Sequence, residues 1–297
     1  MPFLVGTRTV LMESWNAKAA IVLIEEHKIV GTVAATPFLM ELTNEAAAAK
    51  TGLPSLRLFA CGGAAIPPDI VRKANSTFSS PCAFRVYGST EVPLVTLGYT
   101  GAQHAQLAAT TDGEIIDYDV RLIDDRGQDV PQGSEGEIIV RGPAMFMGYA
   151  DEEQTREAIC NGYFQTGDIG TITSKGALII TGRKKDLIIR GGENISAKEI
   201  EDVLHRHPAV IDAAVVAMPH ARLGEGICAF LVPAEGASQS FAALADFVYS
   251  SGLAKQKCPE RIEWVESLPR TTSGKIRKDL LREEIQAIIR RESAGDA

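Results

Sequence analysis

The sequence lacks the features that mark several large classes of protein. Its five cysteines are an odd and dispersed set without CxxC spacing, which argues against a disulfide framework and against a zinc site. Basic residues are not in excess, because 30 Lys and Arg against 38 Asp and Glu give a net charge of −8, so nucleic-acid binding is not expected. The longest apolar stretches, such as residues 19–24, are far shorter than the ~20 residues that a helix needs to cross a bilayer. No signal-like segment opens the chain, so we expect a protein of the reducing cytoplasm without a transmembrane segment.

The pattern of apolar and turn residues divides the 297 residues into three stretches. Residues 1–108 alternate strand-like runs with helical stretches, which is typical of α/β layers. Residues 109–184 hold short β-prone runs between turn residues, and we expect a small antiparallel β subdomain there. Residues 185–297 read as an α+β domain, in which Ser196 and Glu199 have the spacing of a capping box at a helix start.

One segment with chemical potential, Tyr87-Gly88-Ser89-Thr90-Glu91, is expected to end a strand. Gly88 permits close approach to the backbone, and Tyr87 offers an aromatic face for a base. The Thr90 hydroxyl suits an anionic oxygen, and the Glu91 carboxylate suits a hard cation such as Mg²⁺. Taken alone, the segment is more typical of an ordinary strand-to-loop turn with a surface glutamate.

Two further turns carry similar alternatives. The segment Cys61-Gly62-Gly63-Ala64-Ala65 leaves room for a flat ring against the backbone, or is a plain glycine turn. The segment Thr166-Gly167-Asp168 is expected to close a loop, where the carboxylate accepts both hydroxyls of a ribose or is simply solvated.

Basic residues and glycines follow one another from residue 182 to residue 201. The fork of donors on Arg183 suits ribose or phosphate, and Lys185 lies where a hinge between two domains is expected. The pair Gly191-Gly192 is predicted to interrupt a strand, as a bulge or as a passage for a ligand chain. A solvated basic turn is the alternative.

A loop at residues 270–275 precedes the last predicted helix. Its Lys275 is predicted to be a mobile point charge for an anionic transition state, although an exposed lysine at a helix entry is the plainer interpretation.

Taken together and in order, these segments resemble the AMP-forming adenylating superfamily of acyl-CoA synthetases, peptide-synthetase adenylation domains and beetle luciferases. The resemblance runs over nearly all of the chain, and four more segments fit the family pattern: residues 136–143, 147–149, 224–225 and 257–259. It implies an α/β large-domain portion with a small β subdomain, followed by a mobile α+β C-terminal domain. It also implies an enzyme that joins a carboxylic acid to AMP from ATP and then transfers the acyl group to a thiol, usually that of CoA. ATP or AMP, Mg²⁺ and CoA are the ligands that follow.

The resemblance assigns roles on the nucleotide side. It implies that Glu91 binds Mg²⁺, Thr90 contacts the phosphate and Tyr87 stacks on adenine, within a segment that includes Gly88 and Ser89. It further implies that Gly62, Gly63 and Ala64 line the adenine and acyl region. The ribose would be held by Asp168 and Arg183.

Roles on the moving side follow in the same way. Lys185 matches the hinge, and Lys275 matches the lysine that stabilises the transition state of adenylation. Gly191 and Gly192 match the glycines beside the tunnel for the pantetheine arm of CoA.

The sequence departs from the family pattern in one large respect. The Ser/Thr/Gly-rich phosphate loop that ends in Pro-Lys-Gly is absent, and with it the first half of the large domain, so a missing N-terminal half is an expected partner. Acetate-specific members have Trp where this chain has Gly88, so a medium-chain, alicyclic or aromatic acid is expected. The alternative is a non-catalytic or complementing fragment that binds AMP or CoA.

Overall fold

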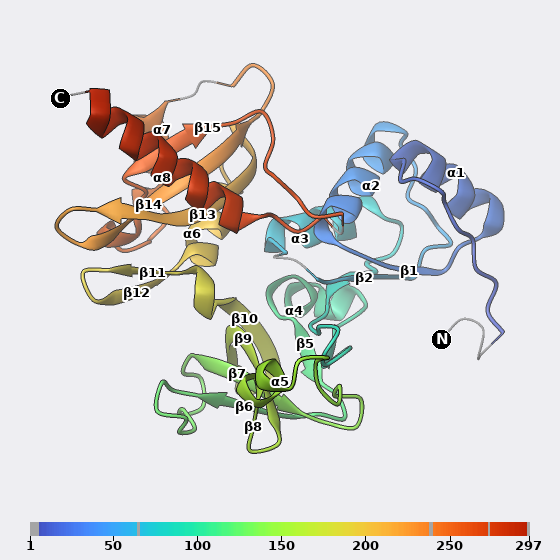
Figure 1. The fold of residues 1–297 in the computed structure, drawn as a ribbon. Helices are drawn as coiled ribbons and strands as arrows, with labels where there is room; N and C mark the ends of the chain where they lie inside the picture. The colour runs from blue at the N-terminus through green and yellow to red at the C-terminus, as the bar shows by residue number, and fades with distance from the viewer. Residues whose placement is uncertain (1–5, 64–65, 238–239, 273, 296–297) are drawn as a thin grey trace. The chain divides into compact units, whose positions relative to one another are not determined.

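The computed structural model describes residues 6–63, 66–237, 240–272 and 274–295 (Figure 1). The chain forms two compact units. Unit 1 comprises Met1–Ser89 and Leu94–Ile116, and unit 2 comprises Thr90–Pro93 and Asp117–Ala297. The finer division of the chain at residues 108 and 184 stays a prediction.

Unit 1 is an α/β layer built on three parallel strands in the order β1, β2, β3. Its helices are α1 (Ala17–His27), α2 (Thr36–Ala48), α3 (Pro68–Thr77), the 3₁₀ helix η1 (Ala102–His104) and α4 (Ala105–Thr110). Its strands are β1 (Gly31–Ala34), β2 (Leu58–Cys61), β3 (Ala83–Arg85), β4 (Thr96–Leu97) and β5 (Gly113–Ile115). Parallel strands need crossover connections, which α2 and α3 supply here.

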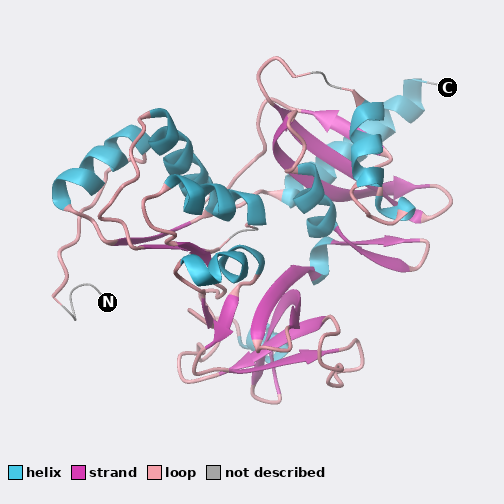
Figure 2. Ribbon diagram, turned by 180° about the vertical axis from the view of Figure 1, so that it is seen from behind, coloured by secondary structure: helices cyan, strands magenta, loops and turns pink. Residues whose placement is uncertain are grey.

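Alternation along the strands of unit 1 fixes its two faces. Phe59 and Cys61 pack into the core cluster with residues of α1, α2 and α3, whereas Ala60 and Phe84 pack with Ala108 of α4 on the other side. Figure 2 shows α1 and α2 together on one side of these strands. Helix starts follow local chemistry, since the Asn16 side chain accepts the Ala19 amide at 2.9 Å at the start of α1.

The first part of unit 2 is an antiparallel sheet in the order β10, β9, β7, β6, with β8 paired to β9. Its elements are β6 (Asp119–Ile123), β7 (Gly136–Arg141), α5 (Glu152–Ala158), β8 (Ile159–Cys160), β9 (Tyr163–Ile172), β10 (Ala177–Arg183) and the 3₁₀ helix η2 (Lys184–Asp186). Ile123, Ile139 and Tyr163 cluster on one face of this sheet. The expected antiparallel β region is therefore present.

The second part of unit 2 is a sheet with helices on both faces. Its strands run in the order β12, β11, β14, β13, and β15 pairs in parallel with β14. The elements are β11 (Leu187–Arg190), β12 (Glu193–Ser196), α6 (Ala197–Leu204), β13 (Val210–His220), β14 (Gly224–Pro233), α7 (Phe241–Ser250), η3 (Lys255–Lys257), β15 (Arg261–Trp264) and α8 (Lys278–Gly295). Val215 and Leu231 pack against α6 and α7, and Val216 and Phe230 pack against α8. Both faces are covered, and residues 213–218 of β13 and 227–232 of β14 are accordingly continuous apolar runs.

The predicted capping box at the start of α6 is wrong. Ser196 is the N-cap residue, but its hydroxyl donates to the Thr181 carbonyl at 2.6 Å and caps no helical amide. Glu199 instead pairs with Lys257, with its carboxylate 2.5 Å from the ammonium. Tertiary partners have replaced the local ones, because both side chains lie where another element reaches them. In the described residues no helix is long and apolar enough to cross a membrane.

Candidate functional site

The segment from Tyr87 to Glu91 lies in a loop between β3 and β4 rather than at the end of a strand, since β3 ends at Arg85. The two ends of this loop are joined. The Tyr87 amide donates to the Thr96 hydroxyl at 2.9 Å, and the Thr96 amide donates to the Tyr87 carbonyl at 3.2 Å. Tyr87 is buried, with 8% of its surface exposed, whereas Thr90 is exposed. The loop is therefore fixed at its base and carries its polar residues toward its middle.

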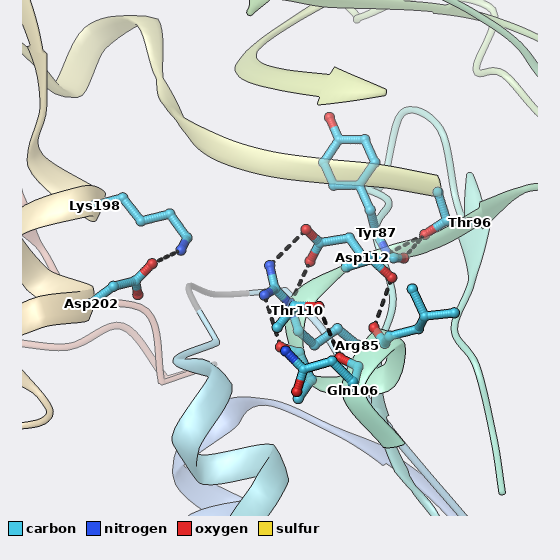
Figure 3. Close-up of polar contacts among 11 residues, drawn as sticks. Arg85, Tyr87, Thr96, Gln106, Thr110, Asp112, Lys198 and Asp202 are labelled. Atoms are coloured by element: carbon cyan, nitrogen blue, oxygen red, sulfur yellow. Dashed lines mark hydrogen bonds and ion pairs between the residues drawn. The ribbon is translucent and has the colours of Figure 1, made fainter. Parts of the chain in front are cut away.

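A buried ion pair lies beneath the base of this loop (Figure 3). The Arg85 guanidinium donates to both carboxylate oxygens of Asp112, at 2.9 and 2.7 Å, and also to the Ala109 carbonyl at 3.2 Å. The two side chains are only 3% and 6% exposed. The Thr96 hydroxyl in turn donates to the Asp112 carbonyl. Sequence motifs missed this network, although a charged residue within the apolar run at residues 83–86 indicates a buried partner.

In the glycine pair after β2, the packing of neighbouring atoms requires a glycine at Gly62, which the sequence did not reveal. A Cβ on Gly62 would lie 2.9 Å from Val86 Cγ2 and 3.1 Å from the Val86 carbonyl, so no side chain fits there. Gly63 has a φ of +80° and opens onto free space. Ala64 lies outside the described residues. The adenine and acyl role of this turn stays a prediction.

Glu91 belongs to unit 2 and contacts an aromatic cluster there. Its carboxylate accepts the Tyr149 hydroxyl at 2.9 Å, and its carbonyl accepts the Phe146 amide at 2.7 Å. Tyr149 packs edge-on against Phe146, and Phe146 packs edge-on against Phe164. Burial and the neighbouring Glu91 raise the pKa of Tyr149, so its phenol stays a donor to the carboxylate.

The residues around Glu91 suit Mg²⁺, and they do not suit a metal ion whose ligands all come from protein. The described residues contain no group of three or more His, Cys, Asp or Glu that would hold an ion. Mg²⁺ commonly takes one or two carboxylates and completes its shell with water and phosphate oxygens. A single carboxylate, Glu91, beside the exposed Thr90 fits that pattern.

Asp168 and Arg183 face each other on adjacent strands. They are register partners on β9 and β10, and Arg183 Nε lies 2.6 Å from Asp168 Oδ1. The side chains are 12% and 48% exposed, respectively, so the arginine reaches solvent while the carboxylate is mostly covered. The expected loop at residues 166–168 is wrong, because these residues lie within β9. The structure nevertheless brings together the two residues expected to hold a ribose.

The expected hinge falls in η2, between two anchored neighbours of Lys185. Lys184 pairs with Glu137 of β7 at 2.7 Å, and Asp186 pairs with Arg282 of α8 at 3.0 Å. Within the part of the chain that the structure describes, the exposed Lys185 ammonium has no such partner. One side of the junction is thus tied to the β10–β9–β7–β6 sheet and the other to the C-terminal region.

Gly191 and Gly192 form the turn between β11 and β12, so the predicted interruption within a strand is wrong. Their φ angles are +60° and +90°, values that a tight hairpin demands and that glycine adopts without strain. The Gly191 amide donates to the Leu223 carbonyl at 2.9 Å, which ties this turn to the one between β13 and β14. Both glycines are exposed.

Lys275 is exposed in a loop spanned by hydrogen bonds. Its carbonyl accepts the Thr271 amide at 2.8 Å, and its own amide donates to the Thr271 hydroxyl at 3.1 Å. Arg270 donates to the Gly274 carbonyl at 2.5 Å and pairs with Asp212 of β13. The backbone around Lys275 is therefore held by the C-terminal sheet, while its side chain extends into solvent.

The chain resembles known proteins over nearly its whole length. The family model of the AMP-binding enzyme matches residues 1–150, and that of the AMP-binding enzyme C-terminal domain matches residues 199–275. The chain is 40% identical over 287 residues to a medium-chain fatty-acid–CoA ligase of Escherichia coli (strain K12). The aligned region covers 96% of this chain and 50% of that relative. It is 37% identical over 286 residues to a 2,3-dihydroxybenzoate-AMP ligase of Bacillus subtilis (strain 168), covering 94% and 52% of the two chains.

A solved structure shares the fold. It is the o-succinylbenzoate coenzyme A synthetase from Bacillus subtilis in complex with ATP and magnesium ion, with a TM-score of 0.80 at 27% identity, covering 96% of this chain and 57% of that one. The chain belongs to the AMP-binding enzyme family, as the sequence motifs predicted, and it spans about half the length of the curated relatives it matches.

Proposed function

We propose that the chain provides the ribose, magnesium and thiol sides of an ATP-dependent acid–CoA ligase. The observation that carries this proposal is the Asp168–Arg183 pair, which places a carboxylate and a half-exposed arginine side by side on adjacent strands. A carboxylate accepts two hydroxyls of a ribose, and the guanidinium donates to the sugar or its phosphate. The overall reaction joins an acid to AMP with release of pyrophosphate, and then exchanges AMP for the thiol of CoA.

The residues of the Tyr87–Glu91 loop would act on the nucleotide. Glu91 holds Mg²⁺, which neutralises phosphate charge when bound, and Thr90 donates its hydroxyl to a phosphate oxygen. Tyr87 provides its ring to adenine, and Gly88 and Ser89 allow the base and phosphate to approach the backbone. The family's solved relative with bound ATP and magnesium supports these ligands.

Residues of the C-terminal region would take part in the two half-reactions one after the other, because that region would move between them. Lys275 donates to the developing charge during adenylation, because a positioned ammonium stabilises an anionic transition state. Lys185 would be the pivot between the sheet that Lys184 contacts and the C-terminal region that Asp186 contacts. The Gly191–Gly192 turn lies beside the path of the CoA arm and leaves space that a side chain would fill.

For the acid, we propose a medium-chain, alicyclic or aromatic substrate. Gly88 leaves more space than the tryptophan of acetate-specific members, and the names of the two curated relatives cover a medium-chain fatty acid and an aromatic acid. We place the reaction in the cytoplasm, since the dispersed cysteines, of which Cys61, Cys82, Cys228 and Cys258 are buried thiols, suit a reducing compartment.

The test separates the two half-reactions. Acid-dependent ATP–pyrophosphate exchange is measured for the 297-residue chain, for the chain mixed with an N-terminal half from the 40%-identical ligase, and for Lys275→Ala in both settings. We expect Lys275→Ala to lower exchange at least about a hundredfold, because one transition-state donor is lost. Thioester formation from supplied acyl-adenylate is expected to stay within about twofold of the unmodified chain. Equal loss of both half-reactions would contradict the role of Lys275.

A second candidate function is that of a complementing fragment, and the edge of the unit 1 sheet favours it. In the described residues β1 pairs on one side only, with β2. Val30 and Val33 at this edge are 59% and 73% exposed, and an unpaired apolar edge is a template for another strand. Exchange activity that appears only after the N-terminal half is added would favour this candidate, whereas robust exchange by the chain alone would exclude it.

A further inference from the structure

One buried residue, Thr96, holds the start of the loop that carries Tyr87. Thr96 is completely buried, and its Oγ1 accepts the Tyr87 amide at 2.9 Å while donating to the Asp112 carbonyl. A hydroxyl has a single hydrogen and two lone pairs, so these contacts use its donor and one acceptor. The Thr96 amide also donates to the Tyr87 carbonyl at 3.2 Å. One residue thus fixes both polar groups of the Tyr87 backbone.

The acceptor of the Thr96 hydroxyl is itself immobilised. Asp112 receives two hydrogen bonds from Arg85, whose remaining nitrogen donates to the Ala109 carbonyl. The next residue, Gly113, has a φ of +102°, and a Cβ there would lie 2.3 Å from the Leu97 carbonyl. Glycine at this position permits the close approach of β4, which carries Thr96, to β5.

We propose that Thr96 is a positioning residue that sets the orientation of Tyr87 toward the base of a bound nucleotide. Figure 3 shows the Tyr87 ring projecting away from the Arg85–Asp112 pair, from the stretch of backbone that Thr96 holds. The direction of the Cα–Cβ bond follows from the backbone, so a hydrogen bond to the Tyr87 amide directs the ring without touching it. The inference rests on the proposed function, because it assigns the Tyr87 ring to nucleotide recognition.

The test uses three threonine variants of the full chain. Thr96→Val keeps the shape of the side chain and removes its hydroxyl, and Thr96→Ser keeps the hydroxyl. Thr43→Val is the matched control, because Thr43 is 1% exposed in unit 1 and donates its hydroxyl to the Leu39 carbonyl at 2.6 Å, within α2. Two quantities are measured: the exchange rate of the Tyr87 amide hydrogen, and the dissociation constant of AMP by titration calorimetry.

We expect Thr96→Val to speed exchange of the Tyr87 amide and to weaken AMP binding, each by about tenfold, because a buried donor loses its acceptor. Thr96→Ser should restore both values to within about threefold, since a hydrogen bond of ordinary strength is kept. Thr43→Val should leave the AMP dissociation constant unchanged, and any faster exchange of the Tyr87 amide in this control measures the contribution of lost overall stability.

The other outcomes separate this inference from the proposed function. Unchanged amide exchange in Thr96→Val would overturn the hydrogen-bonding role of Thr96. Faster exchange with unchanged AMP affinity would overturn its role in nucleotide recognition. Failure of the unmodified chain to bind AMP would instead overturn the proposed function, whatever the variants do to exchange.

Discussion

Two arginine–aspartate pairs, one in each unit, use the same chemistry in different surroundings. In unit 1, Arg85 and Asp112 lie 2.7 Å apart with side chains 3% and 6% exposed. In unit 2, Arg183 and Asp168 lie 2.6 Å apart with side chains 48% and 12% exposed. A buried charge that loses its partner is costly, whereas a half-exposed one is solvated and replaceable. The first pair is therefore enclosed by protein, whereas the arginine of the second pair reaches solvent.

A third pair lies between these extremes. The His205 ring donates from Nδ1 to the Glu201 carbonyl at 2.7 Å, and its Nε2 faces Asp212 at 3.4 Å. The side chains of His205 and Asp212 are 17% and 19% exposed, and Asp212 also pairs with Arg270. The three pairs form a series in which burial, rather than distance, is expected to set the effect of a substitution.

The largest effect on this series is expected at the buried pair. Asp112→Ala should lower the free energy of unfolding by about 3–5 kcal/mol, because it leaves the Arg85 charge uncompensated in the interior. Urea denaturation of the full chain, followed by circular dichroism, measures this change. The matched control is Asp69→Ala, which breaks the exposed Arg72–Asp69 pair at 2.7 Å and should cost about 0–1 kcal/mol. If both variants lower the free energy of unfolding by a similarly small amount, burial does not distinguish the Arg85–Asp112 pair from exposed pairs.

An intermediate effect that depends on pH is expected at His205. Burial opposes its protonation, but the hydrogen bonds to Asp212 and to the Glu201 carbonyl outweigh burial and raise the pKa of His205 above its usual 6.5. A raised folded-state pKa means that stability is fully present below pH 6.5 and is lost as the pH rises through the folded-state value.

Replacing His205 with glutamine should therefore destabilise the chain by about 1–2 kcal/mol at low pH and by less at high pH. The midpoint of urea denaturation, measured for both proteins at a series of pH values around and above neutrality, tests the sign. The buried Asp212 stays charged throughout, because its contacts with His205 and Arg270 outweigh burial and hold its pKa below 3.8. A difference that grows as the pH rises would show that the imidazole is neutral in the folded protein.

The smallest effect on stability is expected at the half-exposed pair. Arg183→Gln should change the free energy of unfolding by less than about 1 kcal/mol, yet weaken AMP binding about tenfold through loss of a charged donor. Calorimetric titration with AMP measures the second effect. The control is Arg156→Gln, which removes a more exposed arginine that lies 3.7 Å from Glu152 and should alter neither quantity. Large destabilisation without loss of AMP binding would make the Arg183–Asp168 pair structural.

The sequence predicted the region of each motif better than its local structure. Asp168 and Arg183 were paired by their expected ribose role, and the structure places them opposite each other on β9 and β10. The loop predicted for Asp168 was wrong, because Gly167 and its φ of +68° are accommodated within a long strand. The Gly191–Gly192 turn was misread as a strand interruption, since a glycine pair has the same appearance in a bulge and in a hairpin.

The residues that hold the loop were not predicted at all. Arg85, Thr96 and Asp112 are separated by 11 and 16 positions along the chain, as the numbering shows, and none carries a motif of its own. Their hydrogen bonds depend on the pairing of β4 with β5 and on the packing of α4. Contacts of that kind leave no periodic signal in a sequence.

The sequence by itself determined the class of fold and the family, because apolar periodicity and short motifs are local properties that survive in the order of residues. Tertiary structure alone decided which charges are buried and which are exposed to solvent. Arg85 and Arg183 are the same residue type, and each is the last residue of a strand. Only folding surrounds the Arg85 side chain with protein and leaves the Arg183 side chain about half exposed to water. Since the cost of a charge depends on its surroundings, that distinction did not exist until the chain was folded.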